Sequence, residues 1–295
     1  MKPKKRIFSC LHTHTTFCDG KAGVEDNCRV AWEKGLQSLG FSTHAPITKK
    51  TGFYDPCWKD KEQRLDKYIE EVNAAKRRWE GKLPVYLGLE VDYVPGLMGP
   101  ADKDYHNLGL DYIIGSVHFM VPEKGAPFTV DHRADILEKG LRESYGGDIY
   151  ALTNAYYEML KAMMRAGGFN ILGHPDLVRK NNLQNKYFNE DTPQYRKQCE
   201  SVVQTAADAG VVIEINTGPV NRGYLDTPYP SLQFLKMFND KNIPMMINAD
   251  SHTPEHLDGF YEEAKVIAQA AGYVEMVRFS KCKDGCPVWK KVRLV

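Results

Sequence analysis

The chain has 295 residues, of which 42% are hydrophobic and 26% are charged, and its formal net charge is +1. These values are typical of a globular protein with a sizeable core, and a net charge near zero gives no general attraction to nucleic acid or to an anionic membrane. No apolar stretch approaches the roughly 20 residues that span a bilayer, and the first residues lack the apolar region of a signal peptide. The basic run at residues 2–6 is expected to be a solvated tail. We therefore expect neither a nucleic-acid partner nor a membrane partner.

The cysteines indicate the redox environment. The chain has seven of them, an odd number, and they form no Cys-X-X-Cys pair. Scattered cysteines of this kind are typical of free thiols in a reducing compartment, so we expect a cytoplasmic protein. Cys282 and Cys286 are close enough in sequence to hold a metal, but without a neighbouring ligand we expect a pair of thiols in a turn.

Apolar runs that resemble strands alternate with helical patterns along the chain. This alternation is typical of βα units around a parallel sheet. The predicted strands span residues 7–11, 36–41, 84–89, 110–117, 169–172, 211–215 and 243–248. The predicted helices span residues 24–34, 61–80, 149–166, 194–209, 231–240 and 258–271, and residues 273–279 are a candidate for a last short strand. Seven strands with helical crossovers predict an α/β barrel, because closure leaves no unpaired sheet edge.

One segment fits no βα period. Residues 119–148 are rich in glycine, proline and charge and stand between two predicted units. A connection of this length is more often a functional lid than a linker. We therefore expect a single domain over residues 1–295, with a lid or insert at 119–148.

Side chains that bind metals follow most of the predicted strands. His12 and His14 project the same way from the end of the first strand, because side chains alternate along a strand, and Asp19 follows after a short turn. The other candidates beside strand ends are His44, Glu90, His118, His174, Asp250 and His252. The carboxyl ends of the strands build the active site in parallel barrels. Random placement would not bring six of the nine histidines to such positions.

The ligand types indicate which metals fit. Imidazoles and carboxylates without thiolates suit Zn, Mn, Fe or Co. Nine candidate ligands exceed the coordination number of one ion, so we expect two or three divalent metal ions, with Zn, Mn or Fe as the first choices. Glu90, which follows the third strand alone, is the natural bridging ligand.

Seven motifs occur in a fixed order through most of the chain. They are LHTH (11–14), FCDG (17–20), FSTHAP (41–46), GLEVDY (88–93), GSVHF (115–119), GHPDL (173–177) and NADSH (248–252). Together they resemble the polymerase and histidinol phosphatase (PHP) superfamily, and within it the histidinol-phosphate phosphatases. The resemblance implies a distorted, TIM-like (β/α)7 barrel with a trinuclear metal site at the carboxyl end of the strands. It also implies hydrolysis of L-histidinol phosphate to L-histidinol and phosphate, a step of histidine biosynthesis.

The resemblance also implies how the ligands are shared. One ion would be held by His12, His14, Glu90 and Asp250, a second by Glu90, His118 and His174, and a third by Asp19, His44 and His252. Asp19 stands where some relatives have histidine, and its oxygen would shift the preference of that site toward Mn or Fe.

The expected reaction is direct attack on phosphorus. Closely spaced cations lower the pKa of a bridging water from ~15.7 toward 7 and neutralise the phosphate oxygens in the transition state. No phosphate loop or Cys-X5-Arg motif supports a covalent intermediate. We expect Glu90 to bridge the ions and an acid to supply the proton for the leaving alkoxide. Asp19, His252 and His106 are the candidates for this acid, and the sequence does not choose among them.

Residues that bind the substrate are less clear from the sequence. Arg179 follows His174 by five residues and is predicted to clamp the phosphate, with Arg222 as a second candidate. The ammonium and imidazole of histidinol phosphate need carboxylates and an aromatic ring. Residues that flank the ligand positions are Asp92, Tyr93, Asp102, Asp104 and Phe119. Of these we select Asp92 for the substrate site, and we expect His132 and His256 to be surface histidines.

Three other functions compete. A PHP phosphoesterase that acts on nucleotides or other small phosphate esters shares the metal ligands, so this alternative stays open. A metal-dependent amidohydrolase also begins with His-X-His, but that class has a different bridging residue and a lone terminal aspartate. A non-catalytic PHP scaffold would have lost ligands, and all nine are present. We therefore expect an enzyme that acts on a small phosphate ester.

Overall fold

Seven parallel strands form one sheet in the order β1, β2, β3, β4, β7, β8 and β9. The computed structural model of the chain describes residues 8–48, 51, 53, 61–281 and 287–294. The strands are β1 (Ser9–Cys10), β2 (Ser38–Phe41), β3 (Val85–Asp92), β4 (Tyr112–Ser116), β7 (Ile171–Leu172), β8 (Val212–Asn216) and β9 (Met245–Asn248). Nearly every residue in them is buried, as expected for parallel strands covered on both faces.

The two edges of this sheet meet just beyond the strands. Thr13 and Ser251 form a parallel bridge, the His14 N–H donates to the Ser251 carbonyl at 2.8 Å, and the Ser251 N–H donates to the His12 carbonyl at 3.0 Å. The sheet is therefore nearly closed into a barrel, and the prediction of an α/β barrel is confirmed. Closure occurs at the carboxyl end of the strands, beside the predicted metal ligands.

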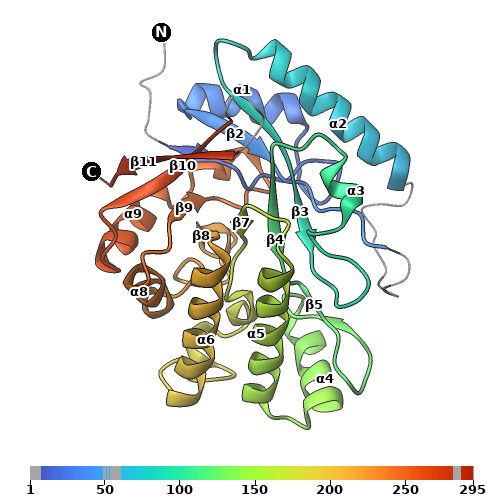
Figure 1. Cartoon of the computed structure of the whole chain (residues 1–295), viewed down its shortest axis with the longest axis vertical. Helices are drawn as coiled ribbons and strands as arrows, with labels where there is room; N and C mark the ends of the chain where they lie inside the picture. The colour runs from blue at the N-terminus through green and yellow to red at the C-terminus, as the bar shows by residue number, and fades with distance from the viewer. Residues whose placement is uncertain (1–7, 49–50, 52, 54–60, 282–286, 295) are drawn as a thin grey trace.

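Helices surround the sheet (Figure 1). The longer ones are α1 (Val24–Lys34), α2 (Lys61–Arg78), α4 (Ala134–Tyr145), α5 (Ile149–Ala166), α6 (Pro193–Ala209), α8 (Leu232–Asp240) and α9 (Tyr261–Ala270). The short ones are α3 (Lys103–His106), α7 (Gly218–Asn221) and the 3-10 helices η2 (Leu177–Arg179), η3 (Leu183–Asn185) and η4 (Pro254–Asp258). Local signals set their ends: α1 stops at Gly35, which has a left-handed φ of 76°, and the Thr192 hydroxyl caps α6.

The interior of the barrel is filled by a separate apolar cluster. Its members include Leu11, Tyr112, Ile114, Ile171, Val212 and Met246. The hydroxyl of Tyr112 donates to the carbonyls of Leu11 and Phe41, so its polar tip is satisfied inside the barrel. Gly88 of β3 makes room for this ring, since a Cβ there would lie 2.5 Å from Tyr112 Cζ.

The last part of the chain closes the amino-terminal end of the barrel. Strands β10 (Glu275–Lys281) and β11 (Pro287–Arg293) form an antiparallel hairpin. Phe279 packs on Tyr86 and Tyr112, with ring centroids 4.9 Å and 5.6 Å away. The strand predicted near 273–279 is therefore present, but it belongs to this hairpin rather than to the central sheet.

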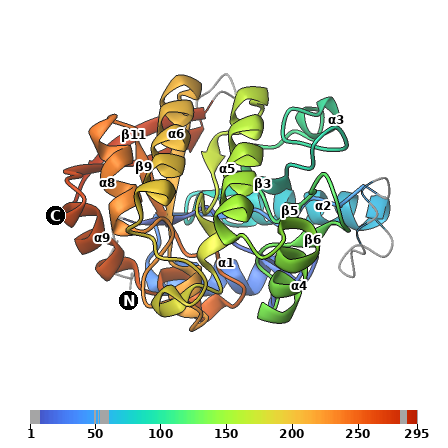
Figure 2. The ribbon, with the colours of Figure 1, turned by 90° about the horizontal axis from the view of Figure 1, so that it is seen from below.

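Residues 119–148 stand outside the central sheet. Strands β5 (Phe119–Met120) and β6 (Phe128–Thr129) form a small hairpin, and α4 follows. Figure 2 shows these three elements together beside α5. A role as a lid, within a single domain over the whole chain, stays a prediction.

Some predicted boundaries differ from the structure. Glu90 lies inside β3, which continues to Asp92, rather than after a strand that ends at residue 89. The helix predicted at 258–271 begins only at Tyr261, because a 3-10 turn with Pro254 at its start comes first. The basic run at 2–6, Cys282 and Cys286 lie outside the described residues. Among the described residues, no helix is both long and apolar enough to cross a membrane.

The close contact at Gly88 gives a test of the barrel interior. We expect Gly88→Ala to lower the free energy of unfolding by about 1–3 kcal/mol, because the added methyl meets the Tyr112 ring on a buried strand. Gly23→Ala is the control, since a Cβ at Gly23 meets nothing closer than 3.9 Å. Urea unfolding measures both variants, and equal stability of the two would contradict this packing.

Candidate metal centre

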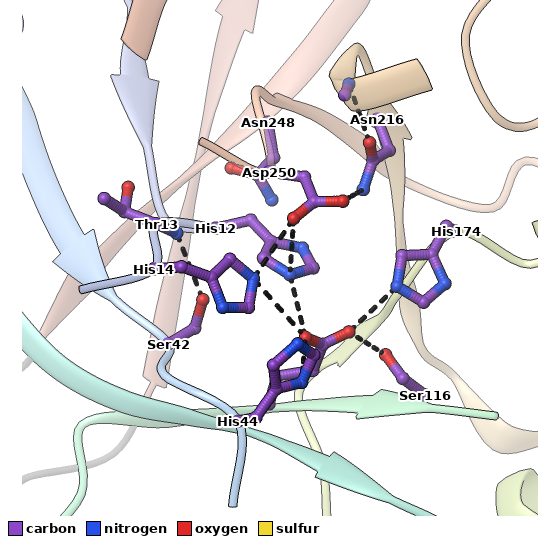
Figure 3. Close-up of polar contacts among 12 residues, drawn as sticks. His12, Thr13, His14, Ser42, His44, Ser116, His174, Asn216, Asn248 and Asp250 are labelled. Atoms are coloured by element: carbon purple, nitrogen blue, oxygen red, sulfur yellow. Dashed lines mark hydrogen bonds and ion pairs between the residues drawn. The ribbon is translucent and has the colours of Figure 1, made fainter. Parts of the chain in front are cut away.

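All nine predicted ligands lie at the carboxyl end of the barrel. They come from the segments after β1, β2, β4, β7 and β9 and from the second half of β3. In Figure 3, the side chains of His12, His14, His44, His174 and Asp250 point toward one another. The alternation predicted for the first strand holds, because the rings of His12 and His14 are neighbours with centroids 5.2 Å apart.

Glu90 occupies the middle of this group. Its carboxylate is 1% exposed, and its Oε2 atom lies 3.3 Å from His12 Nε2, 3.5 Å from His14 Nε2 and 3.0 Å from His44 Nδ1. One oxygen of a single carboxylate therefore faces three imidazoles from two other strands.

The second oxygen of Glu90 faces the opposite side. Glu90 Oε1 lies 2.8 Å from His174 Nε2 and 3.7 Å from His118 Nε2, and it accepts a hydrogen bond from the Ser116 hydroxyl at 2.7 Å. Because its two oxygens lie close to different histidines, Glu90 has the geometry of a bridging ligand.

Asp250 completes the inner group. Its Oδ1 lies 3.1 Å from His14 Nε2 and 3.5 Å from His12 Nε2, and its Oδ2 accepts from Arg222 at 2.9 Å. The backbone of Asp250 is left-handed, with φ 47°, and that of His174 has φ 21°. Strained backbone of this kind is concentrated at functional sites, where the surroundings hold a side chain in a required direction.

The outer group contains the most exposed ligand. Asp19 is 44% exposed, and its Oδ2 lies 3.0 Å from His252 Nε2. Its Oδ1 lies 3.5 Å from His14 Nδ1 and 3.9 Å from His44 Nε2. Asp19 and His252 therefore stand at the mouth of the site.

These side chains form overlapping sets whose ligand atoms lie within 4.8 Å of one another. The sets are His14, Asp19, His44 and His252; His12, His174 and Asp250; His12, His14 and Glu90; and His44, Glu90 and His118. In the third set, His12 Nε2, His14 Nε2 and Glu90 Oε2 are buried and have no hydrogen-bond partner in the part of the chain that the structure describes. Buried polar atoms normally have partners, and a divalent cation among these three would satisfy all of them. The residues present therefore fit a metal centre.

The electrostatics of the inner group also fit a cation. Burial alone would raise the pKa of Glu90, but His12, His44 and His118 outweigh it and hold that pKa well below its ordinary value. Burial, with the rings of His252 and His44, lowers the pKa of His14 to about 3. These are the protonation states that a metal requires of Glu90 and His14. At His12, burial is outweighed by the carboxylates of Glu214, Asp250 and Glu90, which raise its pKa well above the ordinary value, so a metal there would displace a proton.

A buried carboxylate outside the ligand set, Glu214, orients the ring of His12. Glu214 of β8 is fully buried, and its two oxygens lie 3.1 Å and 3.0 Å from His12 Nδ1. It also accepts from the side-chain amides of Asn216 and Asn248 and from the backbone N–H of His174. The pKa of Glu214 is lowered, since His12 outweighs the effect of burial, so the ring donates from Nδ1 and turns Nε2 toward the ligands.

Glu214 was not predicted from the sequence, because it lies inside a strand and not at a strand end. A charge within the apolar run at 211–215 was the one available signal.

Asp92, predicted for the substrate site, instead accepts from the His118 backbone N–H at 3.1 Å and lies 2.8 Å from His118 Nδ1. It is buried and orients His118 as Glu214 orients His12.

Arg179 does not reach the ligand group. Its side chain is 7% exposed and is held by Glu190 at 2.8 Å, by Asp176 at 3.2 Å and by the carbonyl of Pro228. The η2 turn directs it sideways into this buried ion-pair network, away from the metal cavity. The prediction of a phosphate clamp at Arg179 is therefore corrected.

Two other cations do face the site. Arg222 contacts Asp250 and lies 2.9 Å from His252 Nδ1, as expected for a residue of the β8 loop. Lys180, one residue after Arg179, was missed by the sequence analysis. With the ligands they line a cavity of about 160 Å³, whose walls are Asp19, His44, Glu90, His118, Asp131, His174, Leu177, Lys180, Arg222, Tyr224, Tyr229, Asp250 and His252.

The remaining predicted residues lie elsewhere. His106 Nε2 is 3.0 Å from the Pro100 carbonyl, and Asp102 accepts from the backbone N–H of Gly99. Among the described wall residues of the cavity, none is Tyr93, Asp102, Asp104 or Phe119. His132 is exposed and His256 is partly exposed, as predicted.

Comparison with known proteins places this geometry in a family. The family model described as the PHP domain matches residues 11–218, which is more than half of the chain. The chain belongs to the PHP domain family. It is 29% identical over 272 residues to the probable histidinol-phosphatase of Deinococcus radiodurans, an alignment that covers 92% of this chain and 96% of the relative. It is 27% identical to the histidinol-phosphatase of Bacillus subtilis, over 85% of this chain and 96% of that protein.

A solved structure shares the fold of this PHP protein. The histidinol phosphate phosphatase of Lactococcus lactis, crystallised with zinc, L-histidinol and phosphate, superposes with a TM-score of 0.65 at 19% identity. The match covers 95% of this chain and 98% of the other.

The carboxylate behind His12 provides a test of the centre. We expect Glu214→Gln to weaken binding of the tightest divalent ion by about 10–100-fold, because residues that orient metal ligands have effects of this size. Competition with a chromophoric chelator measures the affinity. Glu200→Gln on the exposed surface of α6 is the control, and unchanged affinity in Glu214→Gln would contradict the orienting role.

Proposed function

We propose that this chain is a metal-dependent phosphomonoesterase that hydrolyses L-histidinol phosphate to L-histidinol and phosphate. The observation that carries this proposal is one buried carboxylate, Glu90, shared between histidine groups at the floor of a small cavity with two cations in its wall. The proposal is supported by family membership and by two relatives named as a histidinol-phosphatase and a probable one, which align along nearly their whole length.

We assign the ligands to three divalent ions. The first would be held by His12, His14, Glu90 and Asp250, the second by Glu90, His118 and His174, and the third by Asp19, His44 and His252. The contacts of Glu90 through both oxygens support its place in the first two sets. Zinc is the first choice, since the Lactococcus lactis protein was crystallised with it, and Mn and Fe remain compatible with the donor set.

When bound, such ions supply a water of lowered pKa and positive charge beside the phosphate oxygens. The chain itself would hold the ester. Arg222 and Lys180 provide two cationic side chains in the wall of the cavity, where low exposure strengthens their attraction to a dianion. Asp250 keeps Arg222 in place through the contact at 2.9 Å.

The leaving alkoxide needs a proton at the mouth of the cavity. With the first two ions bound and the third site empty, Asp19 Oδ2 and His252 Nε2, which are 3.0 Å apart, can hold a proton between them, close to solvent and to the site. Arg222 Nη1 lies 2.9 Å from the other ring nitrogen, His252 Nδ1, and so helps to orient this ring. We assign proton delivery to this pair, with direct displacement at phosphorus and no phosphoenzyme.

The alternatives differ in their demands on the site. A scaffold needs no intact ligand set, yet all nine candidate ligands are brought together here. A PHP phosphoesterase with another small ester as substrate would use the same residues, so substrate comparison must decide between this function and histidinol phosphate.

Phosphate release provides that comparison. We would measure it from L-histidinol phosphate, nucleoside monophosphates, p-nitrophenyl phosphate and a diester, with added Mn or Zn. A kcat/KM for histidinol phosphate within about 10⁴–10⁸ M⁻¹s⁻¹, far above the other values, is the expected result. Uniformly slow rates would reject this substrate.

The bridging role of Glu90 has a direct test. We expect Glu90→Gln to lower kcat by about 10³-fold or more and to reduce the metal content per chain, because an amide cannot bridge two cations through negative oxygens. Elemental analysis and steady-state kinetics measure both quantities. Glu158→Gln, at an exposed position on α5, is the control, and near-normal activity of Glu90→Gln would contradict the bridge.

The two arginines are expected to behave differently. Arg222→Ala should raise KM for phosphate esters about tenfold or more, because it removes a charged contact of the cavity wall. Arg179→Ala should leave KM unchanged but lower stability by about 3 kcal/mol, because Asp176 and Glu190 lose their partner in a buried network. Kinetics and thermal unfolding of both variants separate the effects, and a raised KM in Arg179→Ala would restore it to the substrate site.

A further inference from the structure

The metal cavity opens toward a second hollow formed by the insert. This outer hollow has a volume of about 370 Å³ and is lined by Thr129, Asp131, His132, Arg133, Lys180, Asn181 and Tyr224. Three of these residues, Asp131, Lys180 and Tyr224, also line the metal cavity. They therefore form the boundary between the two spaces. If the phosphate lies among the metal ligands, the alcohol part of the ester must pass this boundary.

The backbone around Asp131 is held in place from two sides. The Val130 N–H, at the end of the small hairpin, donates to the carbonyl of His118 at 2.8 Å. From the loop after β7, Lys180 Nζ donates to the Asp131 carbonyl, and the Asn181 side-chain amide donates to the His132 carbonyl at 3.0 Å. The contacts of Val130 with His118 and of Asn181 with His132 do not involve Lys180, so they remain when its side chain moves. A carboxylate on backbone held in this way is suited to recognition, because little loop entropy is lost when a ligand binds.

The carboxylate of Asp131 differs from the other acidic groups of the cavity. Among the described residues that line the cavity, the acidic ones are Asp19, Glu90, Asp131 and Asp250, and all but Asp131 belong to a candidate metal set. Asp131 Oδ2 faces Lys180 Nζ at 3.8 Å, and its side chain is 28% exposed. This carboxylate is therefore available to an organic cation.

We propose that Asp131 recognises the ammonium group of the substrate alcohol, while Lys180 turns from Asp131 to the phosphate. This inference rests on the proposed function and adds a residue that selects the substrate. In histidinol phosphate the ammonium stands two carbons from the ester oxygen, so phosphate and ammonium are close together. The phosphate of the substrate can therefore pair with Lys180 while its ammonium pairs with Asp131. Two new ion pairs then replace the single Lys180–Asp131 pair. An ester without the ammonium would leave Asp131 without its partner once Lys180 moves, which disfavours that ester.

Two small esters isolate this interaction. O-phosphoethanolamine keeps the ammonium at the same two-carbon spacing, and n-propyl phosphate has a methyl group in its place. We would measure kcat/KM for both esters in the metal-loaded protein. The expected ratio of amine ester to propyl ester is about tenfold or more, as for a hydrogen bond to a charged group. In Asp131→Asn that ratio should fall to near one, and Asp131→Glu should restore part of it.

Matched controls separate the other roles of Asp131. Asp135→Asn, in the same insert but paired with Arg133 at the surface, should keep the ratio of the native protein. If Asp131 serves only to place Lys180, Asp131→Asn will change both rates by the same factor and leave the ratio intact, which overturns the proposal. A native protein with no preference for the amine ester also overturns it.

The test is independent of the substrate assignment. If the native protein prefers the amine ester and Asp131→Asn loses that preference, the subsite stands even where histidinol phosphate proves a poor substrate. If histidinol phosphate is hydrolysed efficiently but Asp131→Asn does not change the ratio of the two kcat/KM values, the proposed function is supported and the Asp131 subsite is rejected.

Discussion

The site depends on one buried negative charge, the carboxylate of Glu90. An ionised carboxylate in the interior is costly unless charged or polar partners surround it. Here His12, His14 and His44 face one oxygen, and His174 with Ser116 faces the other. The arrangement that stabilises Glu90 also leaves two buried nitrogens, His12 Nε2 and His14 Nε2, without a hydrogen-bond partner among the described residues, and a divalent cation would satisfy both. A metal ion therefore fits the way in which this barrel buries its charges.

The barrel provides the rigidity that this arrangement needs. The ligands belong to strands that are far apart in sequence, and the bridge between Thr13 and Ser251 joins the first strand segment to the last. Behind the ligands, Glu214 and Asp92 fix the rings of His12 and His118. Asp131 and Lys180, two of the residues proposed to contact the substrate outside the metal ligands, lie at the rim, on the insert and on the loop after β7. In the proposed function, residues on or just after the strands would carry the chemistry and these loop residues would select the substrate.

Sequence patterns were sufficient wherever a local rule decides the structure. The helix predicted at residues 24–34 matches α1, and the alternation of His12 and His14 required only that their segment be extended. Sequence patterns were insufficient where the role of a residue depends on the direction of its side chain in the folded protein. Arg179 and Lys180 are neighbours, yet the η2 turn sends one into a buried network and the other into the cavity. Glu214 was overlooked for a related reason, since only the closed barrel shows that its strand passes behind His12. Some partners of Glu214 and Arg179 come from distant segments, such as Asn248 for Glu214 and the carbonyl of Pro228 for Arg179, and no local pattern reveals them.

The most direct test of the account is to locate bound metal in crystals. Anomalous diffraction above the zinc edge, from crystals grown with zinc, measures the number of ions per chain and their positions. The account predicts two or three ions, with the carboxylate of Glu90 between the first two and with His12 and His14 on one of them. A structure with no ion beside Glu90, or with a single ion bound elsewhere, would contradict it.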